Sequence, residues 1–217
     1  MAWEVFEKKA QAYDDWFDRS FGAGAFSLEL ESIRRLVRKA PPDSLEIGVG
    51  TGRFARALDI RFGMDPSRRV VAYAKERGIR TVQAAAESLP FRAASFSSVF
   101  MIATVCFLDE PRRAFAEINR ILRPEGMLVL GLILRDSKWG NFYERKKTFG
   151  NAFYRHANFW KKDALFTVLD KTGFAVTGSL STLFDPPGLP LIVDRKIREG
   201  IHADAGFHAI AARKKCC

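Results

Sequence analysis

The stretch at residues 45–54 reads LEIGVGTGRF, an apolar segment that runs into three closely spaced glycines and then into a helical pattern. Glycine tolerates backbone conformations closed to other residues and lets a ligand approach the bare main chain. The N–H groups at the start of the following helix favour negatively charged groups. A strand, a glycine-rich turn and a helix in this order are typical of the ligand-binding end of a doubly wound α/β sheet.

The sequence on both sides of this turn alternates between strand and helix patterns. This rhythm predicts a Rossmann-like, mostly parallel sheet of seven strands with helices on both faces and a helical cap at the N-terminus. The predicted strands occupy 44–48, 60–64, 79–83, 98–104, 126–134, 173–184 and 207–212. The main predicted helices occupy 3–19, 26–39, 67–78, 110–122 and 161–171.

The chain is expected to form one domain, because its length suits a single core and no repeat or low-complexity tract divides it. Within that domain we distinguish a cap, a ligand-binding core, an aromatic lid insert and a C-terminal helix with strands. These parts cover residues 1–42, 43–134, 135–160 and 161–213, respectively.

The composition is that of a globular protein, with 47% hydrophobic and 28% charged residues and no apolar run long enough to cross a bilayer. Three cysteines are too few for a disulfide framework, so a cytoplasmic location is expected. The net charge of +10 is spread over short basic pairs rather than one arm. Nucleic acid is therefore a less favoured partner than a small molecule. We expect a monomer or a homodimer.

Two nucleotide-binding signatures fail at the glycine-rich turn. The dinucleotide fingerprint needs a glycine where this chain has Arg53, and the P-loop needs a Gly-Lys-Ser/Thr triplet that the chain lacks. Asp65, at the end of the next predicted strand, lies where a carboxylate can accept both hydrogen bonds of a ribose diol. A plainer alternative is that Asp65 serves only to cap the helix that follows Pro66.

Four spaced segments carry a family resemblance. Residues 46–52 (EIGVGTG), 64–67 (MDPS), 86–91 (AESLPF) and 120–126 (RILRPEG) resemble, in order, the signature blocks of class I methyltransferases that use S-adenosyl-L-methionine (SAM). More narrowly, they are similar to the small-molecule branch that includes the ubiquinone- and menaquinone-pathway C-methyltransferases. The chain departs from the pattern at Ala85, where the family commonly has an acidic residue, which puts an adenine hydrogen bond in doubt.

The resemblance implies a role for each matching position. Glu46 and the glycine loop would hold the methionine end of SAM, Asp65 the ribose, and Ala86 and Glu87 the adenine. Ala103 and Thr104 would lie beneath the sulfonium, and Tyr13 would close over the methionine carboxylate. The implied cofactor-binding residues are Tyr13, Glu46, Gly48, Gly50, Thr51, Gly52, Met64, Asp65, Pro66, Ala86, Glu87, Ala103 and Thr104.

The acceptor side gives weaker signals. A sulfonium methyl group is already activated, so the reaction needs in-line placement of the acceptor and not a catalytic triad. We assign no catalytic residue; His156 and Tyr154 are candidate bases, and the spacing of the three histidines predicts no metal site. Aromatic residues of the insert can enclose a planar or cationic acceptor. Trp139, Tyr143 and Tyr154 are the candidates.

Three functions remain open from the sequence. The first is a SAM-dependent methyltransferase of a small molecule, which releases S-adenosyl-L-homocysteine. The second is an RNA or protein methyltransferase, which the charge of +10 keeps open. The third is a non-catalytic SAM-binding protein.

Overall fold

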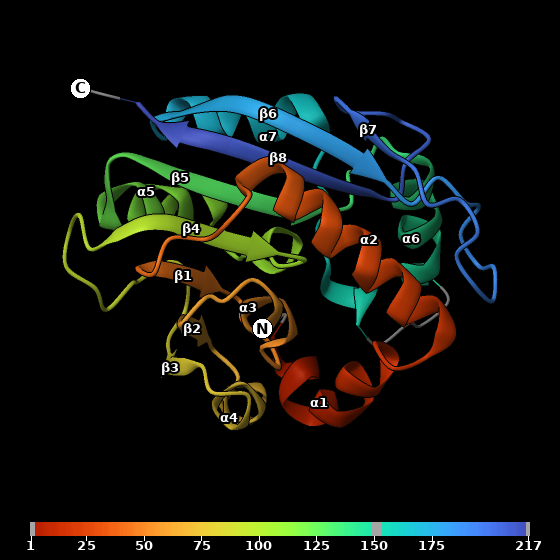
Figure 1. Ribbon diagram of the computed structural model, residues 1–217, viewed down its shortest axis with the longest axis horizontal. Helices are drawn as coiled ribbons and strands as arrows, with labels where there is room; N and C mark the ends of the chain where they lie inside the picture. Colours follow the sequence, from red (N-terminus) through yellow and green to blue (C-terminus); the bar gives the residue numbers. More distant parts are fainter. Residues whose placement is uncertain (1–2, 149–152, 216–217) are drawn as a thin grey trace.

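A computed structural model describes residues 3–148 and 153–215 of the chain. At its centre is one sheet with the strand order β3-β2-β1-β4-β5-β8-β6-β7 (Figure 1). Strands β1 to β5 run parallel, whereas β8, β6 and β7 pair antiparallel at one side. The strands are β1 Ser44–Ile47, β2 Phe62–Asp65, β3 Arg80–Gln83, β4 Phe96–Ile102, β5 Leu122–Leu132, β6 Phe174–Thr182, β7 Ile197–Glu199 and β8 Phe207–Lys214.

The prediction of seven strands was wrong, because the sheet has eight. The additional strand, β7, contains three residues with a single apolar side chain, Ile197, and lies at the edge of the sheet. So short a segment shows no alternation in the sequence, and pairing with β6 creates it. The doubly wound, mostly parallel architecture was predicted correctly.

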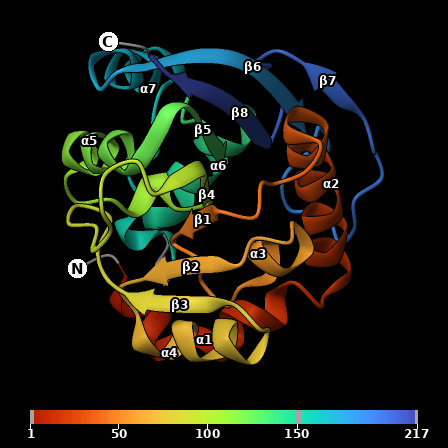
Figure 2. The same cartoon turned by 60° about the vertical axis from the view of Figure 1, so that its left-hand side comes forward.

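Helices cover both faces of the sheet. Helix α2 crosses one face, with α3 on the same side, and α5 and α7 lie on the other (Figures 1 and 2). Each face has its own apolar core, since Phe100 and Val129 point to one side and Val99 and Leu128 to the other. The helices are α1 Glu4–Trp16, α2 Ser20–Val37, α3 Arg53–Ala57, α4 Arg68–Glu76, α5 Pro111–Ile121, α6 Lys138–Thr148 and α7 Lys162–Lys171, with short 3-10 turns η1 Val105–Phe107 and η2 Tyr154–His156.

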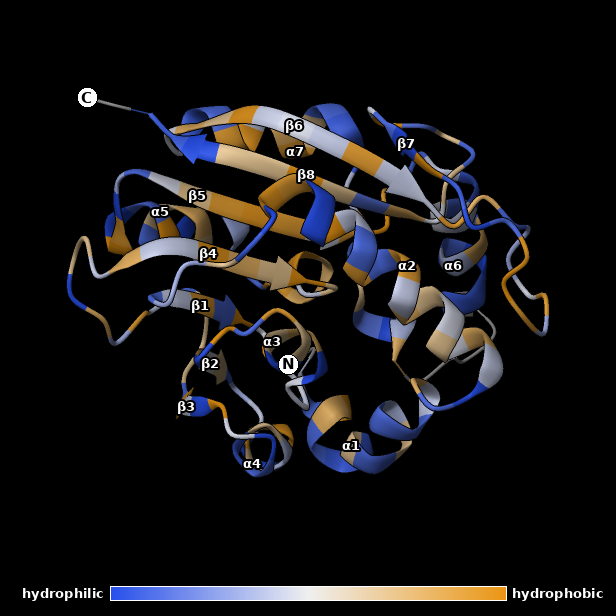
Figure 3. Ribbon diagram, viewed as in Figure 1, coloured by the Kyte–Doolittle hydropathy of each residue, from blue (hydrophilic) through white to orange (hydrophobic). Residues whose placement is uncertain are grey.

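The N-terminal region differs from the expected cap. Helix α2 begins at Ser20, not at residue 26, and packs along β8 and β6 as a covering helix of the sheet. Helix α1 alone lies beyond the sheet, beside α4. Figure 3 shows apolar residues along β5 at the centre of the sheet and polar residues on much of α1. None of the described helices is long and apolar enough to span a membrane.

The carboxyl ends of β1, β2 and β4 meet at one edge, between α1 and α6 (Figure 1). Strand order reverses between β1 and β4, so this edge is the topological switch point at which open α/β sheets bind ligands. Strand β4 ends at Ile102, two residues earlier than predicted, because Ala103 has a left-handed φ of 53° and cannot continue the strand.

Candidate active site

The glycine loop after β1 packs tightly against strand β2 and against Thr104, which follows β4. The N–H groups of Gly48 and Val49 both donate to the Met64 carbonyl oxygen of β2, at 2.8 and 2.9 Å. Gly48 and Gly50 have φ values of 72° and 52°, in the region that glycine adopts most easily. A Cβ atom on Gly48 would lie 2.2 Å from Thr104 Oγ1. The loop therefore has space for bare backbone and none for a side chain at Gly48.

Asp65 joins this loop to the start of helix α4. Its Oδ2 accepts from Gly50 N at 3.1 Å and its Oδ1 from Ser67 N at 2.9 Å. Burial raises the pKa of Asp65 to about 6, although both N–H groups oppose that rise. Each carboxylate oxygen has two lone pairs, so both retain capacity for a further donor. Asp65 thus does support the start of the helix, and it also faces the cavity described next.

A first cavity of about 110 Å³ opens at the carboxyl edge of the sheet. Ten of the thirteen expected cofactor residues line it: Tyr13, Gly48, Gly50, Met64, Asp65, Pro66, Ala86, Glu87, Ala103 and Thr104. Several other residues of the wall were not predicted from the sequence, among them Trp3, Phe6, Ile102, Phe107 and Asp109. On the wall of this cavity, Glu87 Oε1 accepts from the N–H groups of Asp109 and Glu110, at 3.2 and 3.3 Å, and so supports the start of α5.

Three expected residues lie outside the lining of this cavity. Thr51 is buried and its carbonyl oxygen accepts from Arg77 Nη1 at 2.7 Å. Gly52 packs on helix α4, where an added Cβ would lie 3.0 Å from Ala74. Glu46 lies buried in β1, and burial raises its pKa well above the usual value despite the backbone of Ala55. Within the described residues, Glu46 Oε2 has no hydrogen-bond partner.

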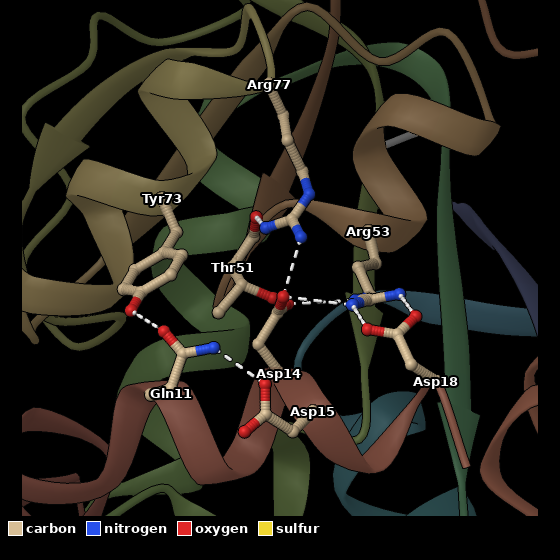
Figure 4. Close-up of polar contacts among 8 residues, drawn as sticks. All are labelled: Gln11, Asp14, Asp15, Asp18, Thr51, Arg53, Tyr73 and Arg77. Carbon is tan, nitrogen blue, oxygen red and sulfur yellow. Dashed lines mark hydrogen bonds and ion pairs between the residues drawn. The ribbon is translucent and has the colours of Figure 1, made fainter.

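Helix α1 is fastened to the glycine loop by ion pairs (Figure 4). Asp14 accepts from Arg53 Nε at 2.8 Å and from Arg77 Nη2 at 2.7 Å, and Arg53 also pairs with Asp18. Burial favours the neutral form of Asp14, but hydrogen bonds from Arg53, Thr51 and Arg77 hold its pKa well below the usual range. This cluster places the neighbouring Tyr13 over the loop.

Asp14→Asn is expected to lower the free energy of unfolding by about 3 kcal/mol, because two guanidinium groups lose the charge that they share. Asp15→Asn is the matched control: Asp15 is exposed on the same helix and accepts from Gln11, so its effect should stay within about 0.5 kcal/mol. Urea denaturation measures both. Equal unfolding free energies for the two variants would contradict the role assigned to Asp14.

The same cluster gives a pH dependence with a defined sign. Since the pKa of Asp14 is lowered in the folded protein, its contribution is present at neutral pH. That contribution declines as the pH falls below the ordinary aspartate value of about 3.9. The stability difference between wild type and Asp14→Asn should therefore shrink between about pH 5 and pH 3.

A second cavity of about 410 Å³ lies next to the first. Its wall comes from α1, α2, η1, α6 and η2 and is largely aromatic. The two cavities share four lining residues: Phe6, Tyr13, Ala103 and Phe107. Ala103 is exposed where the cavities meet. It follows the end of β4 with a left-handed backbone, and its side chain is only a methyl group.

The three aromatic residues expected to bind the acceptor all line this second cavity. Trp139 is also structural, because it is buried and its Nε1 donates to the Asp185 carbonyl oxygen at 2.8 Å. The rings of Tyr143 and Tyr154 have centroids 4.2 Å apart. His156, the other candidate base, is exposed and lines neither cavity.

Glu29 also lines the second cavity and was not predicted from the sequence. It lies four residues after Ala25 and four before Ile33, both buried, so it interrupts the apolar face of α2. An acid on the apolar stripe of an amphipathic helix is a signal that the sequence contains.

Comparison with known proteins places the chain in a family. Residues 45–130 match the model described as "Methyltransferase domain". A crystal structure of a SAM-dependent methyltransferase from Thermotoga maritima, described as a possible histamine N-methyltransferase, is 35% identical with a TM-score of 0.90, over 99% of this chain and 100% of that one. The chain belongs to the SAM-dependent methyltransferases.

Two curated relatives are also similar to the chain, and one of them is named a methyltransferase. An uncharacterised protein of Mycobacterium tuberculosis is 38% identical over 94% of this chain and 72% of its own length. The malonyl-[acyl-carrier protein] O-methyltransferase of Hahella chejuensis is 33% identical over 53% of this chain and 48% of its own. The protein is thus an enzyme, and its cofactor is SAM.

Residues that line the first cavity, together with Glu46 beside it, fit this cofactor. The unpartnered Oε2 of Glu46 is a buried acceptor beneath the glycine loop, and such atoms usually find a partner. The ammonium group of the methionine end of SAM is a donor of the right charge. The bare backbone of Gly48 and Gly50 gives a cradle that a side chain would fill, and Asp65 has acceptor capacity for hydroxyl groups.

Proposed function

We propose that the methyltransferase transfers the methyl group of SAM to a small molecule held in the second cavity. The observation that carries this proposal is the junction of the two cavities, which share Phe6, Tyr13, Ala103 and Phe107. A cofactor in the first cavity with its sulfur toward Ala103 would present its methyl group to the second. An apolar cavity with few polar groups is typical of small-molecule sites.

The residues that line the first cavity, and Glu46 beside it, have distinct roles in this proposal. Asp65 accepts both ribose hydroxyls, Ala86 and Glu87 border the adenine, and Glu46 with the glycine loop holds the methionine end. SAM, when bound, supplies a methyl group on a positively charged sulfur. The protein then has to place the acceptor in line, at roughly 3 Å, and exclude water. The rings of Phe6, Tyr13 and Phe107, which line both cavities, would help to exclude water once both ligands are bound.

The junction itself has little acid–base capacity. Of its four residues, Tyr13 alone has an ionisable side chain. Burial, and then the nearby carboxylates led by Glu29, raise the pKa of Tyr13 far above neutral, so its hydroxyl stays protonated at pH 7. Catalysis by placement therefore accounts for the site better than proton removal by a base at the junction.

The names of the relatives point to acceptors of more than one kind. The Thermotoga relative is described as acting on histamine, a small aromatic amine, and only as a possibility. The relative from Hahella acts on a malonyl group attached to a carrier protein. None of the three relatives above is described as a quinone-pathway C-methyltransferase, so the proposal does not extend to a quinone acceptor.

A cavity-filling substitution tests the proposal. Ala12 is an exposed residue of α1 that lines the second cavity and not the first. Ala12→Trp should therefore reduce methyl transfer from labelled SAM to small aromatic acceptors by at least about tenfold. SAM affinity should remain unchanged. Ala23→Trp, on an exposed position of α2 that lines neither cavity, is the control. Methyl transfer to tRNA or protein but to no small molecule would contradict the proposal.

A further inference from the structure

The second cavity contains one carboxylate among aromatic rings. Glu29 extends from α2 into a wall that includes Tyr13, Phe21, Trp139 and Tyr143. Within residues 3–148 and 153–215, no hydrogen bond or ion pair reaches the Glu29 side chain. Burial raises the pKa of Glu29 to about 8, with no charged partner to oppose it. None of the described residues therefore pairs with the negative charge that Glu29 carries when it is ionised.

The other titratable groups of the cavity do not compensate Glu29. Arg19 and Lys146 also line the wall, but among the described residues no hydrogen bond or ion pair joins either of them to Glu29. Lys146 lies over the Phe142 ring, with its Nζ 4.6 Å from the ring centroid. Burial raises the pKa of Cys106 to about 12. The pKa values of Tyr13, Tyr143 and Tyr154 are raised in the same way, so these four groups are neutral near pH 7.

Glu29 acts electrostatically on both ends of the cavity. Its charge raises the pKa of Tyr13, at the junction with the first cavity, and also that of Tyr143, in α6. The carboxylate therefore lies within electrostatic range of the acceptor space from the junction to the α6 wall. Once ionised, Glu29 would present to a ligand in that space a negative charge weakly screened by water.

Keeping this acid costs stability. Glu29 is half-buried. An acid without a partner in an apolar stripe is unfavourable, and an apolar residue at this position would complete the stripe formed by Ala25 and Ile33. Aromatic faces attract cations, and a carboxylate supplies the opposite charge. A ligand with a protonated amine satisfies both features at once.

We propose that the acceptor carries an amine, and that its ammonium group pairs with Glu29 while the aromatic rings enclose the remainder of the molecule. This inference rests on the proposed function, because it names the class of molecule that enters the second cavity. It assigns Glu29 to binding and specificity, and it leaves the placement of the reacting atom to the junction at Ala103.

The proposal has a consequence for proton balance. In the empty cavity at pH 7 most Glu29 side chains are protonated, whereas pairing with an ammonium group requires the carboxylate. Amine binding should therefore release most of one proton per site at pH 7. Calorimetry in buffers of different ionisation enthalpy measures this release.

The test compares phenethylamine, tryptamine and histamine with uncharged alcohol analogues of similar shape, in the presence of S-adenosyl-L-homocysteine. Wild type should bind at least one amine about tenfold or more tightly than its alcohol, with proton release. Glu29→Gln should remove both the preference and the release while leaving SAM affinity unchanged. Glu31→Gln is the control: Glu31 lies on the same helix, its side chain is 47% exposed and it pairs with Arg35, so this substitution should change neither.

A second variant guards against a purely structural effect. Glu29→Leu should raise the melting temperature by about 2–4 °C, because it removes an unpartnered acid, and it should still abolish amine preference. An amine preference that survives in Glu29→Gln overturns the role of Glu29. Methyl transfer to uncharged acceptors without an amine preference overturns this inference and leaves the proposed function standing. A cavity that binds neither series overturns both.

Discussion

Asp65→Ala is expected to weaken SAM binding by about 1.5–3 kcal/mol, roughly 10- to 150-fold, in a calorimetric titration. The carboxylate lies at the end of β2, where it is fixed by the N–H groups of Gly50 and Ser67. Both of its oxygens retain lone pairs toward the first cavity. Its removal leaves the two ribose hydroxyls without a charged acceptor, and it also frees Gly50 from its side-chain partner.

Asp163→Ala is the control for this prediction, because Asp163 is an exposed acid in the first turn of α7 that lines neither cavity. It should bind SAM as wild type does. Circular dichroism and thermal unfolding establish whether the Asp65 variant keeps its fold. A folded Asp65→Ala protein with unchanged SAM affinity would show that the ribose binds elsewhere.

Gly48→Ala is expected to abolish measurable SAM binding under conditions that saturate wild type. The added methyl group would lie 2.2 Å from Thr104 Oγ1 and 2.8 Å from Thr104 Cβ, so the loop or the end of β4 has to move. Such overpacking typically costs about 1–3 kcal/mol of stability. The left-handed φ of 72° adds about 1–2 kcal/mol for any residue with a Cβ atom.

Gly78→Ala separates these two contributions. Gly78 has a similar φ of 84°, but no atom lies within 4 Å of an added Cβ. This variant should lose only the backbone contribution, about 1–2 kcal/mol, and should retain full SAM affinity. If Gly48→Ala and Gly78→Ala were equally stable and both bound SAM normally, the close approach of the loop to Thr104 would have no functional meaning.

Much of the cofactor side was predictable from the sequence because its determinants are local. A strand, the glycines at 48, 50 and 52, and an acid at the end of the next strand are neighbours along the chain, and sheet topology brings them together. Even here, tertiary packing decides individual roles. Thr51 and Gly52 share the motif with Gly50, yet Arg77 and Ala74 of the neighbouring structure keep them away from the cavity.

The acceptor side was less predictable because distant segments build it. Phe6 of α1, Ala103 after β4 and Phe107 of η1 form the junction only once α1 is fastened over the sheet edge. The fastening depends on Asp14 and Arg77, which are 63 residues apart in sequence. The sequence indicated that the insert at 135–160 is aromatic, but it did not predict helix α6 within the insert. The apolar face of α6 is defined by packing against η2.

The central claim is that the cofactor sulfur faces Ala103 at the junction of the two cavities. A crystal structure with S-adenosyl-L-homocysteine tests it most directly. We predict both ribose hydroxyls on Asp65, the methionine ammonium near Glu46 and the sulfur opposite Ala103, open to the aromatic cavity. A sulfur directed away from Ala103, or a ribose bound away from Asp65, would contradict the account.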